Sequence, residues 1–170
     1  LKWASKEQEI LHWFAGQDRE DVGRGQIIKA IERLAEMADS GMNLPETVDL
    51  IISASYQDKV YYAAYRALFD VFFFCEEEDQ FRIAKHFIEN SRFGYFEDIK
   101  EYFDETEILI EVLQQSNYLE WPYGLPERDT EIITKLGEIG DKRAVEPITI
   151  FLKSNGEKLD LIQQNAAKEA

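Results

Sequence analysis

The sequence predicts an all-α protein, and more specifically a right-handed α-solenoid of about four helix pairs. Three observations lead to this fold class. Apolar residues recur at helical spacing along most of the 170 residues. No stretch alternates convincingly between apolar and polar residues, and no Asn-Gly or Asp-Gly pair joins two such stretches as a hairpin turn would. Similar segments also recur at an interval of 34 residues.

The first four helices are expected in the N-terminal half, each with its apolar residues on one side. They cover residues 5–15, 25–38, 45–55 and 57–75. In the second helix, Ile27, Ile31 and Leu34 are spaced four and three residues apart, which places them on one stripe. Residues 40–43 then interrupt the pattern, and Pro45 suits the first turn of the next helix, where no backbone donor is lost.

The remaining helices follow the same pattern of apolar spacing. They are expected over residues 79–90, 95–103, 105–116, 129–139 and 143–153, with a further helix over 158–170. A loop is expected over residues 116–127, because two prolines and a glycine accompany three large aromatic residues there.

The 34-residue interval is the main organising signal. One set of positions at this interval is Leu34, Leu68, Tyr102 and Leu136, and a second set is Ile31, Tyr65, Ile99, Ile133 and Ala167. A single helix pair cannot bury its apolar faces alone, whereas stacked pairs form a continuous core. The recurrence therefore predicts a helical repeat protein.

Residues 135–153, KLGEIGDKRAVEPITIFLK, resemble the HEAT repeat in the variant also called the PBS-lyase HEAT-like repeat. Gly140 suits the left-handed end of one helix, Asp141 suits the cap of the next, and Pro147 suits its first turn. The residues expected on the buried face are Ala144, Val145, Ile148, Phe151 and Leu152. Residues 30–68 match more loosely, and residues 76–127 match by spacing alone. The resemblance implies one HEAT-like repeat domain over residues 1–170, whether complete or part of a longer chain.

The net charge of −15 is concentrated in residues 57–127, which hold sixteen acidic against six basic residues. Such a surface repels phosphates and anionic lipid heads, so nucleic acid and membranes are not expected as partners. A basic protein or protein segment is the expected partner, and the oligomeric state is left open. Cys75 is the only cysteine, so no internal disulfide forms and a cytoplasmic location is expected.

Two sets of residues form the predicted partner-binding site. The acidic set is Glu46, Asp49, Glu76, Glu77, Glu78, Asp79, Glu101, Asp104 and Glu105, and the aromatic set is Tyr118, Trp121 and Tyr123. The run 76–79 has a second interpretation as a solvated helix start whose carboxylates complement the helix dipole. The aromatic residues are either exposed, as at binding hot spots, or packed between repeats.

The sequence does not predict an enzyme. Neither His12 nor His86 has a His or Cys partner at a metal-ligand spacing, and no metal or cofactor is expected. Cys75 precedes four acidic residues, which raise the pKa of a thiol and oppose a nucleophilic role, so a buried or half-buried structural cysteine is expected. His86 is interpreted as a packed or surface histidine.

The predicted function is therefore a non-catalytic protein-binding module or scaffold that uses an acidic helical surface. One form is an inhibitor or immunity protein that neutralises a basic toxin. The alternative, implied by the family resemblance, is a HEAT-like enzyme or enzyme subunit such as a phycobilin lyase.

Overall fold

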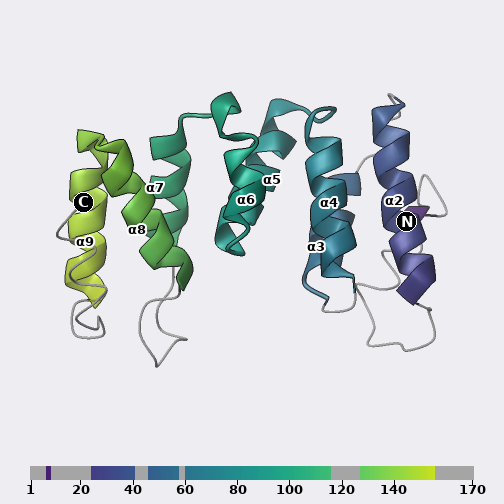
Figure 1. The fold of residues 1–170 in the computed structure, drawn as a ribbon, viewed down its shortest axis with the longest axis horizontal. Coiled ribbons are helices and arrows are strands. Elements are labelled where there is room, and N and C mark those ends of the chain that lie inside the picture. Colours follow the sequence, from purple (N-terminus) through teal and green to yellow (C-terminus); the bar gives the residue numbers. More distant parts are fainter. Residues whose placement is uncertain (1–6, 9–23, 41–45, 58–59, 116–126, 156–170) are drawn as a thin grey trace. The chain divides into compact units, whose positions relative to one another are not determined.

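A computed structural model describes residues 7–8, 24–40, 46–57, 60–115 and 127–155. These residues form eight α-helices and two short 3-10 helices, and no strand occurs among them (Figure 1). The all-α prediction is thereby confirmed. The internal contacts divide the chain within α5, between His86 and Phe87, into two compact units that are described one at a time.

The first unit contains α2 (Arg24–Asp39), α3 (Thr47–Ser55), α4 (Tyr61–Phe72) and the larger part of α5 (Glu77–Glu89). Helix α4 packs against both α2 and α3. The side chains of Ile31, Ile51 and Leu68, one from each of these three helices, are completely buried. Helix α4 ends at Phe72, earlier than the 57–75 helix expected from the sequence, and turn residues follow it.

The second unit contains the end of α5 and six further elements. These are α6 (Phe93–Glu97), η1 (Lys100–Tyr102), α7 (Glu105–Gln115), α8 (Glu127–Ile139), η3 (Lys142–Ala144) and α9 (Val145–Asn155). Helix α7 packs against both α8 and α9. The prediction of a single helix over residues 95–103 is wrong, because this stretch is divided between α6 and η1.

Burial follows the 34-residue interval at most positions. Ile31, Tyr65, Ile99 and Ile133 are all 3% exposed or less. In the other set Leu34, Leu68 and Leu136 are buried, but Tyr102 is 52% exposed. Tyr102 lies in the 3-10 helix η1, which has three residues per turn, so the α-helical register is lost at this position.

The connection between α8 and α9 has most of the features expected from the sequence. Gly140 takes a φ of 68°, and the Asp141 Oδ1 accepts a hydrogen bond from the Arg143 backbone N–H at 2.9 Å. Pro147 lies in the first turn of α9. Val145, however, is 63% exposed and not on the buried face, because the 3-10 turn η3 precedes it and changes the helical register.

Several expectations fall outside the described residues. These are the helix over 5–15, apart from its residues 7–8, the helix over 158–170, and the loop over 116–126. Glu127, expected at the end of that loop, is instead the first residue of α8. In the described part of the chain, no helix has the length and apolar character that crossing a membrane requires.

Candidate functional site

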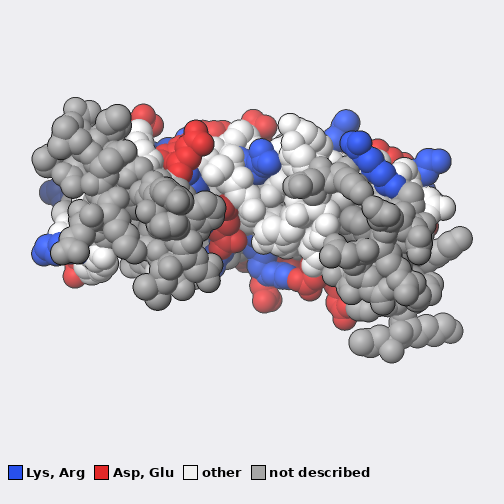
Figure 2. All heavy atoms as spheres, turned by 90° about the horizontal axis from the view of Figure 1, so that it is seen from below, with Lys and Arg blue, Asp and Glu red and all other residues white. Residues whose placement is uncertain are grey.

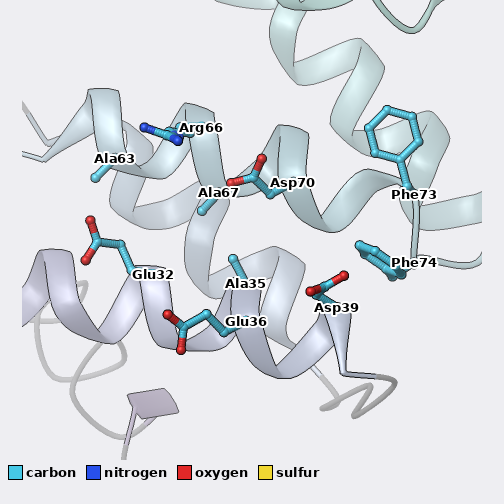
Figure 3. A pocket seen from close by; sticks show the side chains of 10 residues that line it. All are labelled: Glu32, Ala35, Glu36, Asp39, Ala63, Arg66, Ala67, Asp70, Phe73 and Phe74. Atoms are coloured by element: carbon cyan, nitrogen blue, oxygen red, sulfur yellow. The ribbon is translucent and has the colours of Figure 1, made fainter.

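A groove between α2 and α4 in the first unit is the candidate functional site. Its lining residues are Glu32, Ala35, Glu36, Asp39, Ala63, Arg66, Ala67, Asp70, Phe73 and Phe74, and its volume is about 600 Å³. The two helices run side by side in the same direction along it (Figure 3). Binding sites for small ligands commonly have volumes of about 300 to 1,000 Å³.

Helical spacing explains how this lining arises. Residues 32, 35, 36 and 39 are three and four apart and form one stripe on α2, and residues 63, 66, 67 and 70 do the same on α4. Alanine side chains supply the inner part of each stripe: Ala35 and Ala67 are buried, and Ala63 is partly exposed. Such small side chains allow α2 and α4 to pack closely together at the bottom of the groove.

The groove is rich in carboxylates. Glu32, Glu36, Asp39 and Asp70 are all exposed, and Arg66 is the one basic residue in the lining. Glu36 is paired with Arg33 at 2.8 Å, outside the groove. The structure gives Glu32, Asp39 and Asp70 no salt bridge with any described lysine or arginine, so their charge is available to a cationic ligand.

Two aromatic rings lie at one end of the groove. Phe73 and Phe74 follow α4 directly and are 45% and 46% exposed. Asp39 and Asp70 lie at the same end, whereas Glu32 lies toward the opposite end, near Ala63 (Figure 3). An apolar, aromatic surface therefore adjoins carboxylates from two different helices.

The acidic residues predicted from the sequence are partly neutralised. Within the first unit, Arg82 of α5 forms salt bridges with Asp49 of α3 and with Asp79, the latter at 2.7 Å. Arg82 thus brings together two predicted residues that are thirty positions apart. Arg82 carries one positive charge against the two carboxylates, so it neutralises their charge only in part.

The predicted acids of the second unit show a similar arrangement. The guanidinium nitrogens of Arg143 lie 2.7 Å from a carboxylate oxygen of Asp104 and 2.6 Å from one of Asp141. The Lys100 Nζ lies 3.7 Å from the Glu105 Oε1. The pKa of the Asp104 carboxyl lies below its ordinary value, because it accepts hydrogen bonds from the Arg143 side chain and from the Glu107 backbone. These carboxylates cap and connect helices, which opposes a role as free contacts.

Five predicted acids keep an uncompensated charge among the described residues. Glu46 precedes α3, Glu76 to Glu78 lie at the start of α5, and Glu101 lies in η1. All five are exposed, and no described lysine or arginine pairs with them. On the face drawn in Figure 2, acidic and basic side chains stand next to one another. The aromatic set Tyr118, Trp121 and Tyr123 lies outside the described residues.

Sequence reasoning missed the groove, although a signal for it exists. Glu32, Glu36 and Asp39 are four and three residues apart, which marks one acidic stripe on a helix. The matching stripe with Ala63, Ala67 and Asp70 is separated from it by about thirty residues. Only the packing of α4 on α2 brings the two stripes together.

His86 belongs to a buried polar cluster in the first unit. Its Nε2 lies 2.7 Å from Ser55 Oγ and its Nδ1 lies 3.4 Å from the Tyr56 hydroxyl. The Ser55 hydroxyl donates to the Ile52 carbonyl at 2.7 Å, which leaves its oxygen to accept from a proton on Nε2. Burial lowers the pKa of His86 to about 4, so the ring is neutral at pH 7.

This cluster is packed inside the first unit. His86 and Ser55 are 3% and 4% exposed, and the Tyr65 ring stacks on the imidazole with ring centres 5.5 Å apart. Side chains of α3, α4 and α5 therefore meet at one buried histidine. The interpretation of His86 as a packed residue is confirmed.

Cys75 is half-buried, as expected from the sequence. Its pKa is raised to about 11, first by burial and then by the charges of Asp79 and Glu76. The acidic run thus acts in the expected direction, but burial is the larger cause. In the described residues, no group of three or more His, Cys, Asp or Glu side chains is placed to hold a metal ion.

Comparisons with family models, with curated proteins and with solved structures give no match for this chain. The similarity of residues 135–153 to HEAT-like repeats therefore stays a prediction.

Proposed function

We propose that this chain is a non-catalytic binding module that holds a basic segment of another protein in the groove between α2 and α4. The observation that carries this proposal is the composition of the groove. Three exposed carboxylates without a described cationic partner surround an alanine floor, and two exposed phenylalanines close one end. Such a lining suits a ligand that carries both positive charge and apolar surface.

The charge of the whole chain favours the same class of partner. A net charge of −15 accelerates encounters with basic proteins and repels nucleic acid and anionic lipid surfaces. The exposed residues Glu76, Glu77 and Glu78 add to this long-range attraction. Their contribution is to the rate of association, whereas the groove supplies the contacts.

We further propose that the helices belong to a right-handed α-solenoid of HEAT-like pairs. The order of the described helices allows four successive pairs along the chain, namely α2 and α3, α4 and α5, α6 and α7, and α8 and α9. The burial of Ile31, Tyr65, Ile99 and Ile133 at a constant interval supports this arrangement. A scaffold or an inhibitor of a basic protein, in the cytoplasm, is the form of function that fits.

The experiment that tests the proposed function uses charge reversal in the groove. A fluorescent 15-residue amphipathic peptide rich in lysine and arginine serves as the probe, with a glutamate-rich counterpart as the negative peptide. We expect Glu32→Lys combined with Asp70→Lys to weaken binding of the basic peptide at least tenfold in 20 mM salt. In 500 mM salt, the binding of the unaltered protein decreases as well, because exposed charges are screened.

A matched variant separates the groove from the net charge. Glu107→Lys combined with Glu138→Lys changes the net charge equally, on exposed residues of α7 and α8. We expect this variant to lose less than threefold in affinity. Equal losses in both double variants, or no binding of the basic peptide at low salt, contradict the proposed site.

A further inference from the structure

The end of the groove that contains Asp39 and Asp70 combines two kinds of contact. The two carboxylates come from different helices, and they lie at the end flanked by Phe73 and Phe74 (Figure 3). The Phe73 ring packs edge-to-face against Phe69 and Phe72, with ring centres 5.5 and 5.2 Å apart. These contacts hold Phe73 in place while leaving 45% of it exposed.

Arginine and lysine side chains differ in how they contact carboxylates and aromatic rings. A guanidinium is planar, pairs with two carboxylates through several N–H groups, and stacks on aromatic faces. An ammonium is a compact and strongly hydrated charge that gains less from an adjacent ring. A pocket that joins two carboxylates to phenylalanine rings therefore favours arginine over lysine.

We propose that this end of the groove is an arginine pocket, in which Asp39 and Asp70 pair with a guanidinium of the bound segment while its side chain packs on Phe73 and Phe74. The proposal rests on the proposed function and adds the identity of the anchoring side chain.

The rest of the groove predicts the shape of the bound segment. Glu32 attracts a second cation toward the end of the groove near Ala63, and the Arg66 side chain extends toward the same end (Figure 3). Glu32 and Asp39 are seven residues apart, which corresponds to about 10 Å along a helix. A helical segment with basic residues at positions i and i+7 matches this distance.

The test compares three synthetic 15-residue helical peptides with the unaltered full chain. They carry arginine, lysine or citrulline, the neutral analogue of arginine, at positions 4 and 11 and are otherwise identical. We expect the arginine peptide to bind about fivefold more tightly than the lysine peptide in 20 mM salt. The citrulline peptide is expected to bind at least tenfold more weakly than the arginine peptide.

Substitutions in the groove test whether the preference for arginine over lysine depends on its aromatic and acidic side chains. Phe74→Leu keeps an apolar side chain but removes the ring, so we expect it to abolish the preference for arginine while lysine-peptide binding is unchanged. Asp39→Asn combined with Asp70→Asn is expected to weaken both peptides at least tenfold. The controls are Asp98→Asn, which removes one charge, and Tyr102→Leu, which removes one ring, and both alter exposed residues outside the groove. Circular dichroism and urea unfolding verify that each variant is folded.

The outcomes distinguish the two proposals. Equal affinity for the arginine and lysine peptides, with binding still lost in the Asp39→Asn and Asp70→Asn variant, overturns the arginine pocket and leaves the proposed function intact. No peptide binding, or an equal loss in the Asp98→Asn control, overturns both. An arginine preference that persists in Phe74→Leu overturns the role of the aromatic ring.

Discussion

At the scale of single residues, His86 shows how burial changes the protonation state of a side chain. The imidazole lies between Ser55, Tyr56 and Tyr65 and is almost inaccessible, so its charged form loses the hydration that it has in water. Its pKa of about 4 lies below its ordinary value of 6.5. At intermediate pH the unfolded chain therefore binds more protons at this residue than the folded chain does.

The expected consequence is a loss of stability as the pH falls. Above pH 6.5 the neutral ring of His86 does not reduce the free energy of unfolding. As the pH falls from 6.5 to 4, protonation of the unfolded chain at this residue lowers the free energy of unfolding by about 3 kcal/mol in total. Urea unfolding at several pH values measures the free energy of unfolding. Carboxylates titrate in the same range, so the relevant quantity is the difference between the unaltered protein and His86→Gln. A difference that does not vary between pH 7.5 and 4.5 contradicts the prediction.

At the scale of helices and turns, short 3-10 turns change which residues of the following segment are buried and which are exposed. Arg143 donates its backbone N–H to Asp141 and pairs through its side chain with Asp104, at the start of α7. One arginine thus links the beginning of η3 to the N-terminus of another helix. The exposure of Tyr102 and Val145 follows from η1 and η3, the two 3-10 turns of the described residues.

Glycine substitutions test the end of α8. Gly140 has a φ of 68°, a conformation that an alanine adopts only with strain, and its nearest neighbour atom would be 3.9 Å from an added Cβ. Gly140→Ala is therefore expected to reduce the free energy of unfolding by about 1 kcal/mol through the backbone alone. Urea unfolding checks this value.

Gly25 in α2 provides the matched comparison. An added Cβ meets nothing within 4 Å there, and its φ is not positive. Gly25→Ala is expected to leave stability unchanged or raise it by up to about 1 kcal/mol, because alanine favours the helix. Equal losses of stability in the two variants exclude the backbone explanation for Gly140.

At the scale of the whole molecule, the excess of acidic residues is the dominant property. The net charge of −15 produces repulsion among carboxylates that the salt bridges of Arg82, Lys100 and Arg143 compensate only locally. Added salt screens this repulsion beyond about 10 Å at 0.1 M. Stability is therefore expected to depend on ionic strength.

The prediction is that the urea midpoint rises when NaCl is increased from 20 to 500 mM. A variant with Glu76→Gln, Glu77→Gln and Glu78→Gln carries three fewer negative charges and is expected to show a smaller rise. These three residues have no described cationic partner, so the comparison does not disrupt a salt bridge. A midpoint that falls with salt in the unaltered protein shows that salt bridges outweigh repulsion.

The amino-acid pattern was enough to predict the helical class, most helix boundaries and the cap at Asp141, because these depend on contacts between residues close together in the chain. The positions of Gly140 at a helix end and of Pro147 in a first helical turn were predictable for the same reason, because their backbone preferences are local. The spacing also predicted the burial of Ile31, Tyr65, Ile99 and Ile133, whereas the same interval failed at Tyr102.

The pairing of carboxylates with cations on other helices could not be predicted from the sequence. Arg82 lies three residues after Asp79 in α5, so that pair follows from spacing, whereas the salt bridge of Arg82 with Asp49 joins two different helices. The groove likewise depends on the packing of α4 against α2, which places Asp39 and Asp70 at the same end of it. Electrostatic compensation and pocket formation both depend on distances in space, and sequence spacing specifies such distances only within one helix.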